Sequence, residues 1–173
     1  QGMKACTGCA GKGCPAVGGG ALKFNGDWNR MCAPIQWKAE WTSFAAEFDF
    51  HVEKPMSVFS FSANPPSSYH SDWKVNFYTQ AETKDSPITF FLKDQKVQTV
   101  KGVFKGYPAT NKIRIEIIGP AKETRVYIDQ KLVASFVTPS LPPTKNFVFG
   151  AYACCGSTMS TSSVDNVKFF RGQ

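Results

Sequence analysis

Short runs of alternating apolar and polar residues fill the chain from Ala21 onward, and turn-forming residues separate them. Successive side chains of a β-strand point to opposite faces, so this period of two predicts half-buried strands. No stripe with the 3.6-residue period of a helix occurs. We therefore expect strands over the ranges Ala21–Phe24, Ile35–Trp41, Ala45–Val52, Ser57–Ser62, Trp73–Thr79, Ile88–Leu92, Val97–Phe104, Lys112–Ile118, Thr124–Ile128, Leu132–Phe136, Phe147–Tyr152 and Val164–Phe170.

The connections between these runs indicate an all-β sandwich or barrel. Residues 124–136 are predicted to form a hairpin around the short polar turn at Asp129, Gln130 and Lys131. Residues 137–146 contain three prolines, so this connection cannot be a central strand of a sheet. Residues 1–20 are rich in Gly and Cys and are predicted to be a coil without periodic structure. At 173 residues the chain has the size of one domain, 1–173, with a β-sandwich over residues 21–171.

The six cysteines divide between the two ends of the chain, as in disulfide-stapled extracellular domains. A zinc site is the alternative, because the first two have the spacing of metal ligands, but six thiols exceed four ligands. Adjacent cysteines rarely bond each other, so we expect the last two to reach separate N-terminal cysteines and to pin residues 1–32 onto the C-terminal strands. The cysteines are Cys6, Cys9, Cys14, Cys32, Cys154 and Cys155.

Composition and charge limit the class of protein and the kinds of partner that the chain can bind. The chain is 42% hydrophobic and 14% aromatic, which excludes disorder, and no apolar run is long enough to cross a bilayer. It begins with Gln1 and has no basic and apolar leader, as expected after removal of a secretion signal. The net charge of +7 is dispersed without a nucleic-acid motif, so it fits either solvated strand faces or an anionic glycan.

Three segments of the chain carry a family resemblance: the opening at residues 20–26, the middle at residues 114–117 and 125–133, and the ending at residues 163–170. They resemble the concanavalin A-like lectin and glucanase superfamily, which includes the laminin G-like jelly rolls. The resemblance covers about residues 20–171 in the right order and implies two antiparallel sheets, one of them concave and often ligand-bearing. These segments mostly encode packing, so they bear on the fold more than on the function.

The resemblance also implies a structural calcium ion. Asp165 matches an Asp that often helps to bind Ca²⁺ in that family, and Asp27 is a candidate partner. A plain turn-and-strand Asp is the alternative, since such a site needs six or more oxygens. No cofactor is required otherwise.

The acidic run at residues 47–53 is the sharpest candidate for catalysis. Glu47, Asp49 and Glu53 look like the acidic strand of retaining jelly-roll glucanases, although Glu53 falls two residues beyond the shorter form of that motif. In an extended strand Glu47 and Glu53 lie about 20 Å apart, whereas a retaining pair needs about 5 to 5.5 Å. Ordinary polar-out alternation and glycan contact are the alternatives, and we lean against an enzyme.

Glycan binding is the function that the sequence favours, because aromatic rings stack on sugars and polar groups bond their hydroxyls. We expect a secreted, lectin-like domain without a membrane span or a nucleic-acid partner. The alternatives are a polysaccharide hydrolase or lyase and a structural protein that self-associates. If Trp73 points inward, Asn76 and Tyr78 are expected on the open face beside Glu47, Asp49 and His51, and for Trp73 itself core packing is the alternative to ligand contact. The candidate ligand-binding residues are Glu47, Asp49, His51, Tyr69, Trp73, Asn76 and Tyr78.

Overall fold

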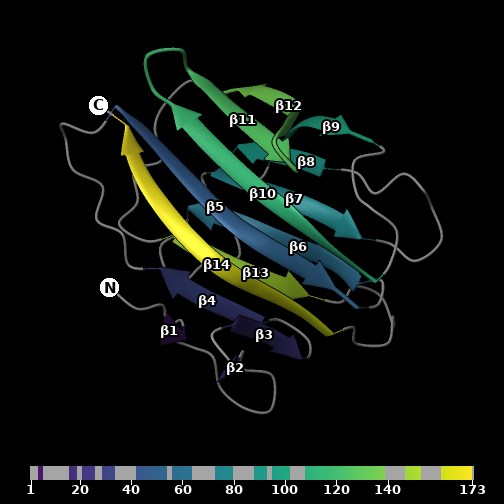
Figure 1. Cartoon of the computed structure of the whole chain (residues 1–173). Coiled ribbons are helices and arrows are strands. Elements are labelled where there is room, and N and C mark those ends of the chain that lie inside the picture. Colours follow the sequence, from purple (N-terminus) through teal and green to yellow (C-terminus); the bar gives the residue numbers. More distant parts are fainter. Residues whose placement is uncertain are drawn as a thin grey trace.

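A computed structural model describes residues 4–5, 16–18, 21–25, 29–33, 42–53, 56–63, 73–79, 88–92, 95–101, 108–138, 147–152 and 161–172. These residues form two antiparallel sheets that face each other (Figure 1), and no helix occurs among them. The predicted all-β sandwich is therefore confirmed. None of the described residues belongs to a helix that could cross a membrane.

We name the two sheets after their middle strands. The β6 sheet has the order β1-β4-β13-β6-β7-β8-β9. Its strands are β1 (Lys4–Ala5), β4 (Asn29–Ala33), β6 (Met56–Ala63), β7 (Trp73–Thr79), β8 (Ile88–Leu92), β9 (Gln95–Val100) and β13 (Phe147–Tyr152). The β5 sheet has the order β12-β11-β10-β5-β14-β3-β2. Its strands are β2 (Ala16–Gly18), β3 (Ala21–Asn25), β5 (Ser43–Val52), β10 (Ala109–Ile118), β11 (Glu123–Ile128), β12 (Lys131–Val137) and β14 (Thr161–Gly172).

Aromatic side chains from both sheets form the core. The β5 sheet contributes Phe48 and Phe50, and the β6 sheet contributes Phe59, whose ring lies 5.8 Å and 4.2 Å from theirs. All three rings are buried. The alternation read from the sequence therefore sends the apolar set inward and the polar set outward, which fixes the faces of β5 and β10.

A buried polar contact also joins the two sheets. The indole Nε1 of Trp73 on β7 donates to the hydroxyl of Thr124 on β11 at 3.2 Å. That hydroxyl is hydrogen-bonded in turn to Thr138, just beyond β12. Because all three residues are buried, these bonds satisfy groups that water cannot reach.

The β11–β12 hairpin has the turn that the sequence suggested, in a tighter form. Asp129 and Gln130 adopt φ angles of 48° and 69°, and β12 begins at Lys131. Two consecutive left-handed residues are typical of a two-residue type I′ loop, whose twist matches that of the flanking strands. The turn sets the register that places Tyr127 opposite Leu132 on the neighbouring strand.

The structure corrects the strand predictions at three places. Residues 1–20 were expected to lack periodic structure, but Lys4–Ala5 and Ala16–Gly18 are short strands that pair with β4 and β3. Asn29–Ala33 is a further strand that carries no alternation. Such short strands form through hydrogen bonds to neighbours rather than through a pattern of their own. The range Val97–Phe104 becomes Gln95–Val100, and Ile35–Trp41 lies outside the described residues.

The pairing of the first strands bears on the cysteines. Lys4 pairs with Cys32 on β4, and β4 lies beside β13, which ends at Tyr152. The start of the chain and the strand just before Cys154 therefore belong to neighbouring parts of one sheet. The other cysteines lie outside the described residues, so the disulfides stay a prediction.

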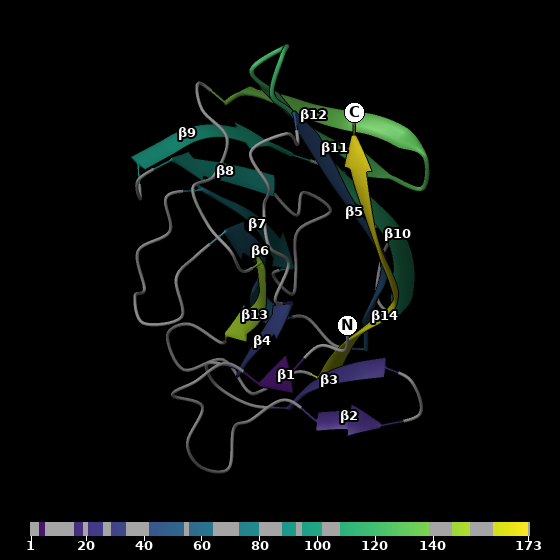
Figure 2. The same ribbon diagram turned by 90° about the vertical axis from the view of Figure 1, so that its left-hand side faces the viewer.

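Figure 2 shows the curvature of the sandwich from the side. β10 and β14 bow away from the opposing sheet, so the outer face of the β5 sheet is convex. This convex face carries the polar half of the alternating pattern on β5, β10 and β14.

Candidate functional site

Polar side chains from four neighbouring strands meet on the outer face of the β5 sheet. Glu47, Asp49 and His51 are outward residues of β5, and each is partly exposed while the residues between them are buried. β10 lies on one side of β5 and β14 on the other. Each outward residue of β5 therefore has a cross-strand neighbour on both sides.

The register lines up one row of side chains across the sheet. Tyr127 on β11 lies opposite Arg114 on β10, Arg114 lies opposite Glu47 on β5, and Glu47 lies opposite Lys168 on β14. An aromatic ring, a cation, an anion and a second cation thus follow one another at right angles to the strands. Directly opposed partners of unlike charge stabilise a sheet modestly.

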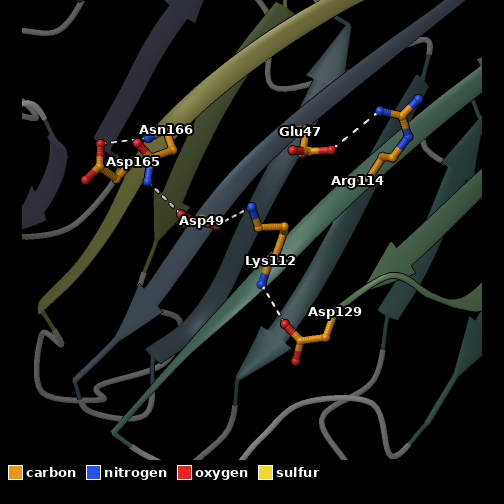
Figure 3. A network of polar contacts seen from close by, with 7 residues as sticks. All are labelled: Glu47, Asp49, Lys112, Arg114, Asp129, Asp165 and Asn166. Atoms are coloured by element: carbon orange, nitrogen blue, oxygen red, sulfur yellow. Dashed lines mark hydrogen bonds and ion pairs between the residues drawn. The ribbon is translucent and has the colours of Figure 1, made fainter.

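Arg114 is the centre of this row. Its guanidinium contacts Glu47 Oε2 at 3.5 Å and Glu116 Oε1 at 2.7 Å (Figure 3 shows the contact with Glu47). The same group lies 5.1 Å from the centre of the Phe170 ring on β14. Two carboxylates and one ring therefore fix the direction of a side chain that is one-third exposed.

A second set of contacts surrounds Asp49 (Figure 3). Asn166 donates its side-chain amide to Asp49 Oδ2 at 2.7 Å, and Lys112 Nζ lies 3.8 Å from Asp49 Oδ1. Asn166 has a φ of 52° at an irregularity of β14, where Asp165 accepts a hydrogen bond from its backbone amide. A bulge of this kind re-aims a side chain, and here it turns Asn166 toward β5.

Arg125 links Tyr127 to Glu123 on the same strand, β11. It is hydrogen-bonded to Tyr127 and to Glu123, and both bonds raise the pKa of its guanidinium, the Glu123 bond more strongly. Glu123 also accepts from Ser135 on β12. These bonds hold the pKa of the Glu123 carboxyl below its usual range, the bond from Arg125 contributing most.

The convex face has a hollow beside this row. Its volume is about 260 Å³, and it lies over β5, β10 and β11. It contains one aromatic ring, two cations, two carboxylates and one amide, contributed by Tyr127, Lys112, Arg114, Glu47, Glu116 and Gln130. Such a set offers both hydrogen-bond donors and acceptors around one ring face.

The structure divides the predicted ligand-binding residues between two sheets. Glu47, Asp49 and His51 lie on the convex face, where His51 Nδ1 is 2.9 Å from the Thr110 hydroxyl. Trp73, Asn76 and Tyr78 lie on β7, and β7 belongs to the β6 sheet. The expectation that Asn76 lies beside Glu47 on one open face is therefore wrong, because an alternating pattern does not say which sheet a strand joins.

Trp73 is the clearest correction. It is 1% exposed and packs its ring edge against Phe61 and Phe90, so no ligand can reach it in this structure. Asn76, on the other face of β7, is also buried. The side chain of Tyr78 and the whole of Tyr69 lie outside the described residues.

Of the three acidic candidates for catalysis, two lie together on one face. Glu47 and Asp49 are held by Arg114 and by Lys112 with Asn166, respectively. Glu53 is exposed and follows the end of β5 at Val52. The ion pairs give the first two carboxylates a role in ordering the convex face.

The proposed calcium ligands are only half described. Asp165 lies opposite Asp49 on the neighbouring strand, whereas Asp27 is outside the described residues. Within the described ranges, no group of three or more His, Cys, Asp or Glu side chains could hold a metal ion.

Sequence reasoning did not select Arg114, Glu116, Tyr127 or Phe170 for the site. The outward alternation of Tyr127 between Val126 and Ile128 was a signal for its direction. No pattern within one strand could have shown that its neighbour across the sheet is Arg114, because that depends on the register.

Comparison with solved structures supports the fold. No protein-family model matches the chain, and no curated protein matches it significantly. A carbohydrate-binding module, CBM66 from Bacillus subtilis, superposes with a TM-score of 0.66 at 12% identity over 91% of each chain. The carbohydrate recognition domain of Emp47p gives 0.68 at 10% identity, over 92% of this chain and 86% of that one.

A sialidase superposes with a TM-score of 0.65 at 13% identity over 90% of this chain. The chain spans only 16% of the length of that sialidase. At these identities the likeness concerns architecture alone. The chain has a concanavalin-like jelly-roll fold.

Proposed function

We propose that the chain is a carbohydrate-binding domain that acts outside the cell and holds a glycan on the convex face of the β5 sheet. The observation that carries the proposal is the hollow of about 260 Å³ beside Tyr127 and Arg114. A sugar presents apolar C–H faces that stack on an aromatic ring and hydroxyls that need directed donors and acceptors. The likeness to a carbohydrate-binding module and to a carbohydrate recognition domain supports the same function.

The charges of the hollow favour a neutral sugar. Lys112 and Arg114 are balanced by Glu47 and Glu116, and Arg114 touches both of these carboxylates. An anionic glycan would have to compete with the carboxylates for the same cations. A neutral hydroxyl can instead accept from the guanidinium and donate to a carboxylate without breaking an ion pair. Binding to this site should therefore change little with salt concentration.

A broad glycan array, run with Ca²⁺ and with a chelator, tests the proposal. Wild type should bind neutral polysaccharides, and loss of signal with the chelator would support the calcium ion expected at Asp165 and Asp27. Release of reducing ends from a bound β-glucan, abolished by Glu47→Gln, would favour a hydrolase instead. If wild type binds no glycan on the array, the proposed function is wrong.

Tyr127 provides the matched variants. Tyr127→Ala should weaken binding about tenfold, because it removes the stacking face, while Tyr127→Phe keeps that face and should retain most of the affinity. Lys96→Ala on β9 is the control, since Lys96 is exposed on the opposing sheet. Equal affinity of wild type and Tyr127→Ala would exclude this hollow as the binding site.

A further inference from the structure

A second exposed ring lies on the convex face, outside the hollow. Phe170 on β14 is 41% exposed, whereas its neighbour Phe169 packs against Phe44 and Phe149 of the core. Four large hydrophobic residues are exposed in the described part of the chain, and Phe170 is the one aromatic among them. A single exposed ring is common on protein surfaces, so its position relative to the hollow decides whether it can belong to the site.

Arg114 links this ring to the hollow. β5 lies between β10 and β14, yet the Arg114 guanidinium reaches to 5.1 Å from the Phe170 ring centre. The side chain therefore crosses over β5. Ala45 lies opposite both Glu116 and Phe170 at this level, and its small side chain leaves room for the crossing.

The other side of the hollow is also apolar. Tyr127 lies opposite Leu132 on the edge strand β12, and Leu132 is 49% exposed. From β11 to β14 the sheet has three inter-strand steps, or about 14 Å at 4.7 to 4.9 Å each. Tyr127 and Phe170 are therefore two separate apolar surfaces, with the Arg114 side chain and its carboxylates between them.

We propose that Phe170 is a second stacking surface of the glycan site, so that the ligand is an oligosaccharide chain lying across the strands from Tyr127 to Phe170. This inference rests on the proposed function. A single sugar fills the hollow and touches one ring. A longer chain can place one unit against Tyr127, present hydroxyls to Arg114 and Glu47, and place a later unit against Phe170.

The test compares ligand length with the Phe170 side chain. Titration calorimetry would use soluble oligomers of glucose, of N-acetylglucosamine and of galactose in graded lengths, with the full chain as wild type and as Phe170→Ala. Wild-type affinity should rise with length by about tenfold once the chain spans both rings. Phe170→Ala should lose this gain. Its affinity for the short oligomers should change much less, because the Arg114 guanidinium keeps its contacts with Glu47 and Glu116.

Two further variants separate stacking from loss of structure. Phe170→Tyr keeps the ring and should restore the dependence on length. Val137→Ala is the matched control, because Val137 is 70% exposed on β12, at the far edge of the same sheet from β14, and should bind as wild type does. Thermal unfolding of each variant verifies that the sandwich is intact.

The outcomes distinguish this inference from the proposed function. If no oligomer binds wild type and the glycan array is blank, the proposed function itself fails. If short and long oligomers bind wild type equally well, or if Phe170→Ala keeps the gain with length, the hollow alone is the site and the role of Phe170 is overturned.

Discussion

Replacing Thr124 with Val should destabilise the protein strongly although it changes the shape of the core very little. Valine has nearly the shape of threonine but lacks the hydroxyl. That hydroxyl accepts from Trp73 Nε1 at 3.2 Å and is hydrogen-bonded to Thr138. Thr124 is fully buried and the other two residues are at most 3% exposed, so water cannot replace the lost partner.

The expected magnitude follows from the groups left without a partner. A buried donor or acceptor that loses its hydrogen bond costs about 1 to 3 kcal/mol. Thr124→Val leaves the indole N–H of Trp73 without a hydrogen-bond acceptor and removes one hydrogen bond of the Thr138 hydroxyl. We therefore expect the free energy of unfolding to fall by about 2 to 4 kcal/mol. A domain with an unfolding free energy of about 5 to 15 kcal/mol would lose a large part of it.

Urea denaturation followed by tryptophan fluorescence measures the change. Thr89→Val is the matched control: Thr89 is also buried, but its hydroxyl is bonded to that of Thr99, which is partly exposed and can bond to water instead, so the cost should be lower. In a Trp73→Phe background, the cost of Thr124→Val should fall by about 1 kcal/mol, since the indole N–H is already absent. If Thr124→Val alone changes the free energy of unfolding by less than about 0.5 kcal/mol, and the dependence of that free energy on urea concentration is unchanged, a buried hydrogen bond between the two sheets is refuted.

Two other predictions follow from the described contacts, and a third follows from the sequence. Ser162→Ala should raise the unfolding free energy by about 1 kcal/mol, because the Ser162 hydroxyl is buried and has no hydrogen-bond partner among the described residues, and an unchanged or lower urea midpoint would contradict this. Glu123 has a lowered pKa in the folded state, so its contribution to stability is present at neutral pH and is lost as pH falls through that pKa. The stability difference between wild type and Glu123→Gln should therefore shrink on acidification, and urea midpoints that keep a constant difference would argue against the bond from Arg125. Peptide mapping without reduction should find Cys154 and Cys155 bridged to separate N-terminal cysteines, and free thiols or bound zinc would contradict the staple.

The faces of the long strands could be predicted from the sequence because burial on one side imposes a period of two. On β10, Ile113, Ile115 and Ile117 are buried while Arg114 and Glu116 face outward, as the pattern indicated. The same reasoning gave the inward direction of the core rings. It needs only local alternation and one buried face.

The composition of the site could not be predicted in the same way. Which strands share a sheet depends on long-range pairing, and the pattern of β7 was compatible with either sheet. The row from Tyr127 through Arg114 to Glu47 exists because a two-residue turn and two registers bring three strands into line. Short strands such as Lys4–Ala5 are equally invisible to the pattern, since two residues cannot display a period.

The central claim is that a glycan binds the convex face of the β5 sheet. An NMR titration of the ¹⁵N-labelled protein with an oligosaccharide that binds on the array would test it most directly. We expect the largest amide shifts at Arg114, Tyr127 and Gln130, with smaller ones along β14 and little change on β6 and β7. Shifts concentrated on β6, β7 and β8 instead would place the ligand on the opposite sheet and contradict the account.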